Sequence, residues 1–282
     1  MTKSALMTTL AVLFALTTSA SAQVSYMPTA SEHIGFYLGA HAWRSDASGD
    51  FGNTNQRIDF NLKNEQHVNY FLAVNHPYPL LPNAKISRTT LATTGQTTIT
   101  QAFSFKNKVF AIGDNVDASF QVSYVDYTFY YELYDDKISS VALGLTLRDL
   151  NGDVTVSKAS DTSDNTCNNP NPSPDLPCYD NTSSSLGQIK TNQIKPMLNI
   201  ASNIKLPLTD VSIFANADIL VMADDTLSDY QVGFSYDLLR SSVGQFKLNL
   251  GYRVINMEFE NLNSLATELA FKGAFVGAVA RF

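Results

Sequence analysis

The sequence predicts an all-β protein, an antiparallel transmembrane β-barrel of about ten strands, with eight or twelve strands as alternatives. Three observations predict it: an N-terminal segment typical of export, repeated alternation of apolar and polar residues, and connections that are alternately short and long. No stretch after Gln23 approaches the apolar length of a membrane helix. We therefore expect a signal peptide over residues 1–22 and one barrel domain over residues 23–282.

The N-terminal segment has the three-part plan of a signal peptide. Lys3 precedes an apolar run from Ala5 to Leu16, and small residues end the segment at Ala20-Ser21-Ala22. This pattern predicts cleavage before Gln23. The alternative, a buried N-terminal helix, would need a cap and a helical period instead of this small-residue ending.

Composition narrows the class of partner. The net charge is -7 and no basic run is present, which argues against a nucleic-acid partner. Aromatic residues make up 11% of the chain and charged residues 16%. Few charged residues together with no long apolar run is the composition expected when apolar and polar residues alternate along β-strands.

Period-two alternation runs through ten segments of the sequence. In residues 246–254, for example, Leu248, Leu250 and Tyr252 share one face, whereas Asn249 and Arg253 share the other. The other clear strands are expected at 34–43, 68–74, 125–133, 141–147, 211–221, 230–238 and 268–282, and two weaker ones at 84–92 and 197–206.

Two packings compete for these strands. A soluble barrel or sandwich turns its apolar face inward, whereas a membrane barrel turns it toward lipid. The composition of the polar face favours the membrane barrel. This face mixes repeated glycines with charged residues, which suits a crowded narrow lumen better than a solvated surface. We therefore expect a polar lumen network of Asp126, Glu132, Arg148, Asp237 and Arg253. A soluble periplasmic β-protein is the rival fold.

The connections predict two different rims. Short or proline-rich junctions are expected at 76–82, 134–137, 206–210 and 238–244, and longer polar ones at 45–57, 97–115 and 158–188, with shorter ones at 223–229 and 260–267. Outer-membrane barrels have short turns at the periplasm and longer loops outside. The segment 158–188 is therefore expected to be extracellular.

Cys167 and Cys178 are the two cysteines of the chain, and both lie in this expected loop. In an oxidising compartment, a close pair most simply forms one disulfide. Free or metal-bound thiols are the alternatives, although the segment contains no histidine to complete a metal site.

Candidate catalytic residues are few. His41 is expected to face the lumen as a hydrogen-bonded filler, with a catalytic base or a ligand as the alternative. The pairs Asp135-Asp136 and Asp224-Asp225 could serve a surface protease, but the first falls in a short turn and no histidine accompanies the second. Loop carboxylates could bind calcium, with a solvated loop as the simpler reading; they are Asp161, Asp164 and Asp175.

The motifs of common enzymes are missing from the sequence, which has no G-x-S-x-G, P-loop or H-E-x-x-H pattern. We name no catalytic, cofactor-binding or metal-ligating residue, and we expect neither an enzyme nor a cofactor. The interior of a ten-stranded barrel is mostly filled by side chains. We therefore expect a structural or surface-interaction role, with a narrow channel for a small solute as the alternative and a surface hydrolase or protease as a weaker one.

Five sequence blocks resemble a family of Gram-negative outer-membrane β-barrel proteins of unassigned function: HPYPLLPN, VDYTFYYELYDD, VALGLTLRDLNGDV, GYRVINMEFENL and FKGAFVGAVARF. The resemblance implies an exported barrel in the outer membrane, in contact with outer-membrane lipid. The final Phe282 looks like the C-terminal signal that such proteins present to the barrel-assembly machinery, with periplasmic chaperones as further partners during biogenesis. The resemblance implies no ligand and no catalytic residue, and an external partner is unknown.

Overall fold

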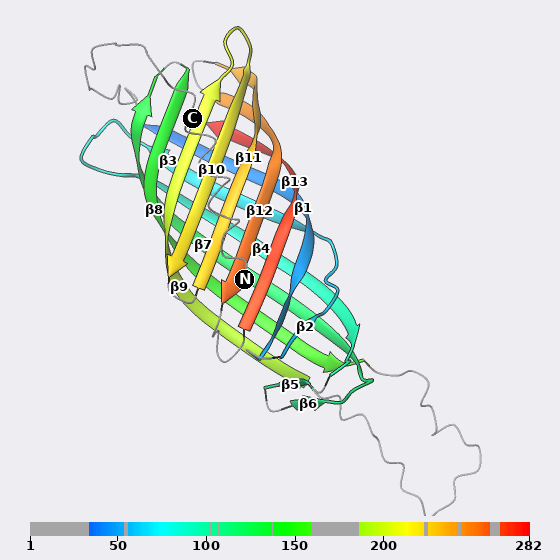
Figure 1. The fold of residues 1–282 in the computed structure, drawn as a ribbon. Coiled ribbons are helices and arrows are strands. Elements are labelled where there is room, and N and C mark those ends of the chain that lie inside the picture. The colour runs from blue at the N-terminus through cyan, green and yellow to red at the C-terminus, as the bar shows by residue number, and fades with distance from the viewer. Residues whose placement is uncertain are drawn as a thin grey trace, which may run out of the picture.

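Ten long strands close on themselves into an antiparallel barrel (Figure 1), as the computed structural model of the chain shows. The structure describes residues 34–53, 56–101, 103–106, 108–136, 138–159, 186–222, 225–241, 244–259 and 266–282. The prediction of an antiparallel barrel with about ten strands is confirmed. The expected signal peptide and the pair Cys167 and Cys178 lie outside the described residues.

Each barrel strand pairs with its neighbours in chain order. The ten are β1 Gly35–Asn53, β3 Glu65–Asn75, β4 Asn83–Thr98, β7 Asn115–Asp135, β8 Ser139–Lys158, β9 Leu186–Lys205, β10 Val211–Met222, β11 Asp225–Arg240, β12 Gln245–Phe259 and β13 Ala266–Arg281. Three short strands add to them: β2 Gln56–Asp59 extends the edge of β1, and β5 Phe103–Phe105 pairs with β6 Lys108–Phe110 in a separate hairpin. No helix among the described residues is long and apolar enough to cross a membrane.

Closure joins the two ends of the described chain. β13 pairs with β1 from Tyr37↔Arg281 to Gly52↔Ala266. The last residue continues this ladder, because the Phe282 backbone N–H donates to the Phe36 carbonyl at 2.9 Å and the Phe36 N–H donates back at 3.1 Å. The terminal aromatic is therefore part of the barrel wall.

The two rims differ as the connections predict. Four short turns and Phe282 lie at one rim, which we call the turn end. β2 and the β5–β6 hairpin lie at the other rim, the loop end, at the bottom of Figure 1, where β8 ends at Lys158 and β9 begins at Leu186.

In the half of the barrel next to the turn end, the turn half, apolar side chains point outward and polar ones inward. Leu250 is 61% exposed, whereas its neighbour Asn249 is 8% exposed. The outward apolar residues form what we call the apolar belt; its large exposed members are Phe36, Leu38, Val68, Tyr70, Leu72, Ile86, Tyr127, Phe129, Tyr131, Leu133, Val141, Leu143, Leu145, Leu198, Ile200, Ile204, Tyr230, Val232, Phe234, Tyr236, Leu238, Leu248, Leu250, Tyr252, Val276 and Phe282.

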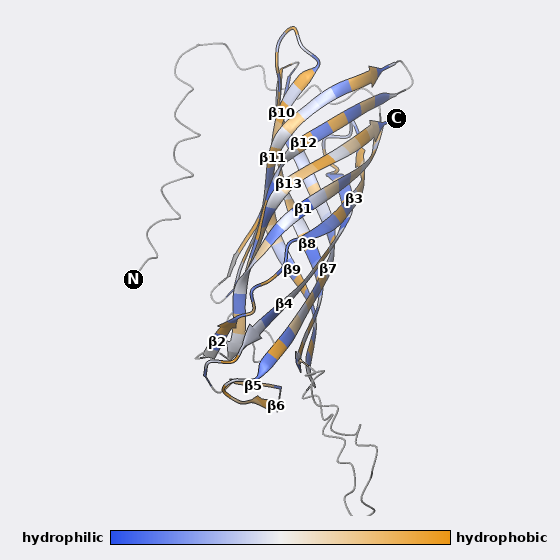
Figure 2. Cartoon of the chain, turned by 90° about the vertical axis from the view of Figure 1, so that its right-hand side faces the viewer, coloured by the Kyte–Doolittle hydropathy of each residue, from blue (hydrophilic) through white to orange (hydrophobic). Residues whose placement is uncertain are grey.

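In the other half, the loop half, the longer strands reverse this polarity. On β7 the inward residues Phe120 and Val122 are buried and apolar, whereas the outward Ser119 and Gln121 are polar. The buried apolar core of the described residues lies mostly in this half; its members include Phe51, Leu91, Phe120, Val154, Val156, Ile189, Leu227, Ile255, Met257, Phe259, Leu269 and Phe271. Figure 2 shows the alternation of hydrophilic and hydrophobic residues along these strands.

This reversal corrects part of the sequence prediction. Residues 45–53 were expected in a loop but continue β1, and residues 103–110 of the expected loop 97–115 form the β5–β6 hairpin. β8 likewise runs through to Lys158, and β11 begins at Asp225 instead of Tyr230. Alternation persists in these segments with its polarity exchanged, so they lack the outward apolar stripe that marked the other strands.

Glycines allow the close packing of the lumen wall. Gly233 and Gly251 lie opposite each other on β11 and β12. A Cβ at Gly233 would come within 2.5 Å of the Leu250 carbonyl oxygen, and one at Gly251 within 2.4 Å of the Val232 carbonyl oxygen. No other side chain fits there without displacing the backbone, which explains the inward glycines of these strands.

Candidate functional site in the lumen

The lumen has three layers between the turn end and the loop end. A polar cavity lies at the turn end, a buried cluster of charged side chains lies beyond it, and an apolar core closes the loop half. The three layers come from one wall, because the inward residues of the longer strands, such as β7 and β8, change from polar to apolar along the strand. The chemistry of each layer follows from this sequence of inward residues.

The middle layer is a cluster of two arginines, two aspartates and a tyrosine, which we call the charge cluster. Arg148 donates from Nε and Nη2 to the two carboxylate oxygens of Asp126 at 2.7 and 2.9 Å, and its Nη2 also lies 2.8 Å from Asp229 Oδ2. Arg253 donates from Nε and Nη2 to Asp229 at 2.9 and 2.8 Å. Tyr124 donates its hydroxyl to Asp229 at 3.1 Å, and its ring lies 3.9 Å from the Arg148 guanidinium.

Because its ions are buried, the charge cluster is stable only if these ions pair with one another. The side chain of Arg148 is completely buried and those of Asp126 and Asp229 are 7% and 5% exposed. Taking such ions out of water costs several kcal/mol each, which only close pairing and further hydrogen bonds offset. Two positive and two negative groups meet here, so the charge cluster is balanced only while all four are present.

One polar atom of the charge cluster and one beside it have no partner within the described residues: Arg148 Nη1 and Trp43 Nε1. The Arg253 guanidinium lies 5.4 Å from the Trp43 ring centroid. A buried donor of this kind either binds a water molecule or remains a cost.

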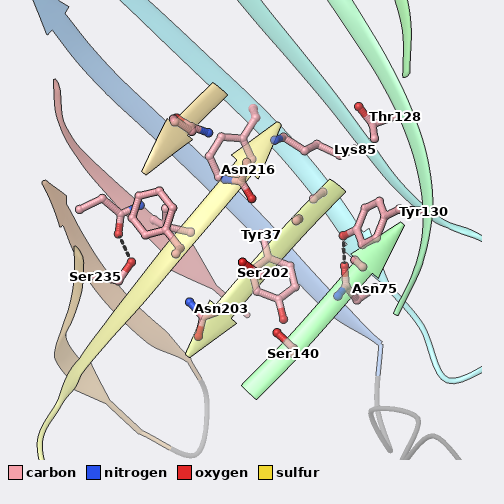
Figure 3. A pocket seen from close by; sticks show the side chains of 18 of the residues that line it. Tyr37, Asn75, Lys85, Thr128, Tyr130, Ser140, Ser202, Asn203, Asn216 and Ser235 are labelled. Carbon is pink, nitrogen blue, oxygen red and sulfur yellow. Dashed lines mark hydrogen bonds between the residues drawn. The ribbon is translucent and has the colours of Figure 1, made fainter. Parts of the chain in front are cut away.

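The turn-end layer is a cavity of about 440 Å³ (Figure 3). Residues of the short turns and strand ends border it on one side, and Asp126, Asp229 and Arg253 border it on the other, so the charge cluster forms its inner wall. Its side chains are mostly hydroxyls, amides and charged groups, with more carboxylates than lysines. Those labelled in Figure 3 are Tyr37, Asn75, Lys85, Thr128, Tyr130, Ser140, Ser202, Asn203, Asn216 and Ser235.

Hydrogen bonds between side chains hold this cavity wall. The Tyr130 hydroxyl donates to Asn75 Oδ1 at 2.5 Å, and Asn75 Nδ2 donates to Glu132 Oε1 at 2.7 Å. Thr146 and Asn199 both donate to Asp218 Oδ1, at 2.6 and 2.9 Å. Such a polar wall suits water and small polar solutes.

The loop half is closed by aromatic rings from the wall and from the β5–β6 hairpin. Phe51 packs on Phe60 and Phe120 at ring-centroid distances of 4.3 and 4.4 Å, and it meets Phe105 of the hairpin at 5.8 Å. Phe103 lies 6.1 Å from Phe60. These contacts make the hairpin a lid, which we call the aromatic lid, over the loop end of the lumen.

Three of the five predicted lumen residues meet in the charge cluster: Asp126, Arg148 and Arg253. The other two lie nearer the turn end. Glu132 accepts the hydrogen bond from Asn75, and Asp237 pairs with Arg240 and with Lys247 at 3.6 Å.

Sequence reasoning missed Asp229 and Tyr124 of the charge cluster. Asp229 precedes the predicted strand 230–238 by one residue, and Tyr124 likewise precedes the strand 125–133. Each has the inward register of its strand, so extending the period by one position would have found both.

Among the described residues, two buried histidines face the lumen: His41, which was a candidate from the sequence, and His67, which was not. His41 is buried in the lumen, where its ring lies 5.0 Å from that of Phe275. His67 Nε2 lies 2.9 Å from Ser45 Oγ, the spacing of a nucleophile and its base, but Ser45 is completely buried and no substrate could reach it.

The acidic candidates do not form a site in the described residues. Asp135 and Asp136 lie at the turn end, as predicted, and Asp225 lies at the loop end in an ion pair with Lys195. Within the described ranges, no group of three potential metal ligands comes together. The carboxylates Asp161, Asp164, Asp175 and Asp224 lie outside the described residues.

No protein-family model matches the sequence, and no curated protein matches it either. Solved structures with similar architecture include the attachment invasion locus protein Ail of Yersinia pestis, at 9% identity and a TM-score of 0.30 over 88% of this chain and 99% of that one. Two others are the transport unit of the autotransporter AIDA-I from Escherichia coli (7% identity, TM-score 0.38, 88% and 89% covered) and the toluene transporter TodX of P. putida (6% identity, TM-score 0.29, 88% and 89% covered). At these values the likenesses say nothing about what this chain binds or does.

Proposed function

We propose that the chain is an integral β-barrel of a Gram-negative outer membrane, anchored by its turn half, with a structural or surface-interaction role carried by its loop half. The reversal of polarity along the strands is the observation that supports this proposal. Outward apolar residues suit lipid, and outward polar residues around an apolar core suit water. A barrel whose outer surface is apolar in one half and polar in the other suits a position partly in lipid and partly in water.

Strand length supports the same arrangement. A membrane-crossing strand needs about 9–11 residues, whereas β7 has 21 and β8 has 20. The surplus would project beyond the lipid as a rigid stub that carries the long loops. Following the usual orientation of such barrels, the turn end would face the periplasm.

The closed lumen argues against a general pore. The charge cluster and the aromatic lid both lie between the turn-end cavity and the loop end. A narrow channel for a small solute is the second candidate, favoured by the polar cavity alone, and it would require both layers to move. We propose no enzymatic role.

Export by the N-terminal segment, assembly by the barrel-assembly machinery through Phe282 and escort by periplasmic chaperones remain part of this proposal. They follow from the sequence and from the resemblance of its blocks, and they are consistent with Phe282 pairing directly with Phe36.

Single-cysteine labelling in intact cells tests the proposal. In a variant with both native cysteines replaced by serine, Gln121→Cys of the loop half should react with a membrane-impermeant thiol reagent, and Leu250→Cys of the apolar belt should not. Membrane fractionation and gel mobility with and without boiling should accompany this, because a folded barrel runs faster before boiling. A soluble protein labelled at both positions would overturn the membrane location.

Conductance of the purified protein in planar bilayers separates the two candidate roles. We expect no steady current from the intact chain. A steady current that small polar solutes block would favour the narrow channel instead.

A further inference from the structure

The loop-side border of the apolar belt is unevenly charged around the barrel. On each strand we take the first outward residue beyond the apolar belt as its border residue. The border residues are Lys272 on β13, Arg44 on β1, Gln66 on β3, Arg88 on β4, Ser123 on β7, Asp149 on β8, Asn192 on β9, Ser228 on β11 and Asn256 on β12. Three cations therefore gather on four consecutive strands, whereas the other border residues of this set are neutral or acidic.

Two of the three cations, Arg44 and Lys272, are neighbours across the closing strands, and Arg88 lies farther round the same side of the barrel. Arg44 lies opposite Gln66 across β1 and β3, and Arg88 lies opposite Tyr70 across β3 and β4. Lys272 lies opposite Asp46 across β13 and β1, two positions along the strand from Arg44. Arg44 and Lys272 are thus diagonal neighbours on paired strands, within reach of long side chains, whereas Arg88 is two strands from Arg44, and its partner Tyr70 lies four positions along β3 from Gln66.

All three cations are exposed and lack ion pairs within the described part of the chain. Two carboxylates flank them: Asp46, opposite Lys272, and Glu65, opposite Ser45. Neither carboxylate is within ion-pair distance of the three, so their positive charge is available to an external anion.

From this placement we infer that Arg44, Arg88 and Lys272 form a docking site for the phosphate groups of a phosphorylated lipid in the loop-side leaflet. This inference rests on the membrane location proposed above, because it places the three cations at headgroup level. Arginine and lysine bind phosphate through charge-assisted hydrogen bonds, and arginine does so with two parallel donors. Tyr70, beside Arg88, is an aromatic residue of the kind that lies at a lipid–water interface. The lipid would sit over β13, β1, β3 and β4, with its acyl chains along the apolar belt.

The test compares two variants with equal loss of charge. R44Q/R88Q/K272Q removes the docking site, and K63Q/K108Q/K190Q removes three exposed lysines away from the border residues. Each protein is reconstituted in neutral phosphatidylcholine nanodiscs, and the binding of lipid A, with and without its phosphates, is measured by native mass spectrometry. Each cation near an anionic surface contributes about a fivefold gain in affinity, so R44Q/R88Q/K272Q should bind phosphorylated lipid A on the order of a hundredfold more weakly than the other two proteins.

Three results would overturn the inference. The two glutamine variants could bind phosphorylated lipid A equally well, the unaltered protein could bind lipid A equally well without its phosphates, or free inorganic phosphate could displace the lipid completely. The variant R44K/R88K, which keeps both charges, should retain most of the binding and shows that loss in the glutamine variant is not misfolding. A protein that fails to enter nanodiscs at all contradicts the membrane location instead, and so separates the two proposals.

Discussion

The longer strands of the turn half continue into the loop half with opposite polarity, whereas β3, with 11 residues, and β10, with 12, lie mostly in the turn half. In the turn half, Leu250 faces outward and Asn249 inward; in the loop half, Phe120 faces inward and Gln121 outward. Backbone pairing is continuous through both halves, and β7 pairs with β8 from Val116 to Asp135. The comparison teaches that the β-ladder sets which residues share a face, whereas the surrounding solvent decides which face is apolar.

Breaking the charge cluster at the junction of the two halves should have the largest effect. Asp229→Ala leaves Arg148 and Arg253 buried with too few partners, so the free energy of unfolding should fall by about 3–5 kcal/mol. Urea unfolding of the refolded protein, followed by the gel shift between folded and boiled forms, measures it. The matched control is Asp153→Ala, an outward carboxylate of the loop half 3.8 Å from Lys190, which should change stability by less than about 0.5 kcal/mol. Equal effects would mean that the buried ions are hydrated.

A charged residue introduced on the outer face should destabilise the turn half much more than the loop half. Leu250→Arg places a cation in the apolar belt and should cost about 2–4 kcal/mol in a bilayer. Gln121→Arg makes a comparable change on the outer face of the loop half and should stay within about 0.5 kcal/mol. The measurement is unfolding of protein reconstituted in lipid vesicles. If both substitutions cost the same, the outer surface of the barrel meets one solvent throughout.

A smaller effect should come from the hydrogen bonds of the turn-half lumen. Ser235 donates to Asn249 Oδ1 at 2.6 Å, and Ser235→Ala should cost about 1 kcal/mol because water in the cavity can replace part of the bond. In contrast, Phe51→Ala in the dry loop half should cost about 3–5 kcal/mol, which ranks with the charge cluster. Similar losses for both would show that the turn-half lumen is packed as tightly as the loop half.

The smallest effect is expected from acid at the turn end. Asp136 accepts hydrogen bonds from the Tyr134 hydroxyl and from the backbone N–H groups of Ser139 and Ile138, the latter two at 2.6 and 2.7 Å. These bonds lower the pKa of Asp136 from 3.8 to about 2. A depressed carboxyl pKa stabilises the fold fully above the unfolded pKa, and this stabilisation is lost as the pH falls from about 4 to about 2. Asp136→Asn should remove that part of the acid dependence, measured as the unfolding midpoint in urea at several pH values; an unchanged pH profile would contradict it.

The sequence predicted the turn half better than the loop half. Strands such as 125–133 stood out because large apolar residues alternate with polar ones, and the facing of Leu250 and Asn249 followed from glycines and charges on the inner face. Residues 45–53 were missed because Ala47, Gly49 and Phe51 give only a weak inward stripe, and no single strand shows that a closed core lies behind it. The charge cluster was predicted in part, since Asp126, Arg148 and Arg253 fall on recognised strands. Asp229 lies one position before the predicted strand 230–238, so its inward facing could have been read from the sequence, but its contacts with Arg148 and Arg253 across the lumen could not.

The pairing of β1 with β13 also sets the order of events in folding. The first and last described strands must meet before the wall closes, so the contact comes from opposite ends of the chain and is intrinsically slow. Until then both edges expose unpaired backbone, which recruits other strands and leads to aggregation. The time that the chain spends unclosed in water therefore limits the yield of folded barrel. A factor that shields the two strand edges, or speeds the pairing of β1 with β13, raises this yield without changing the stability of the folded barrel.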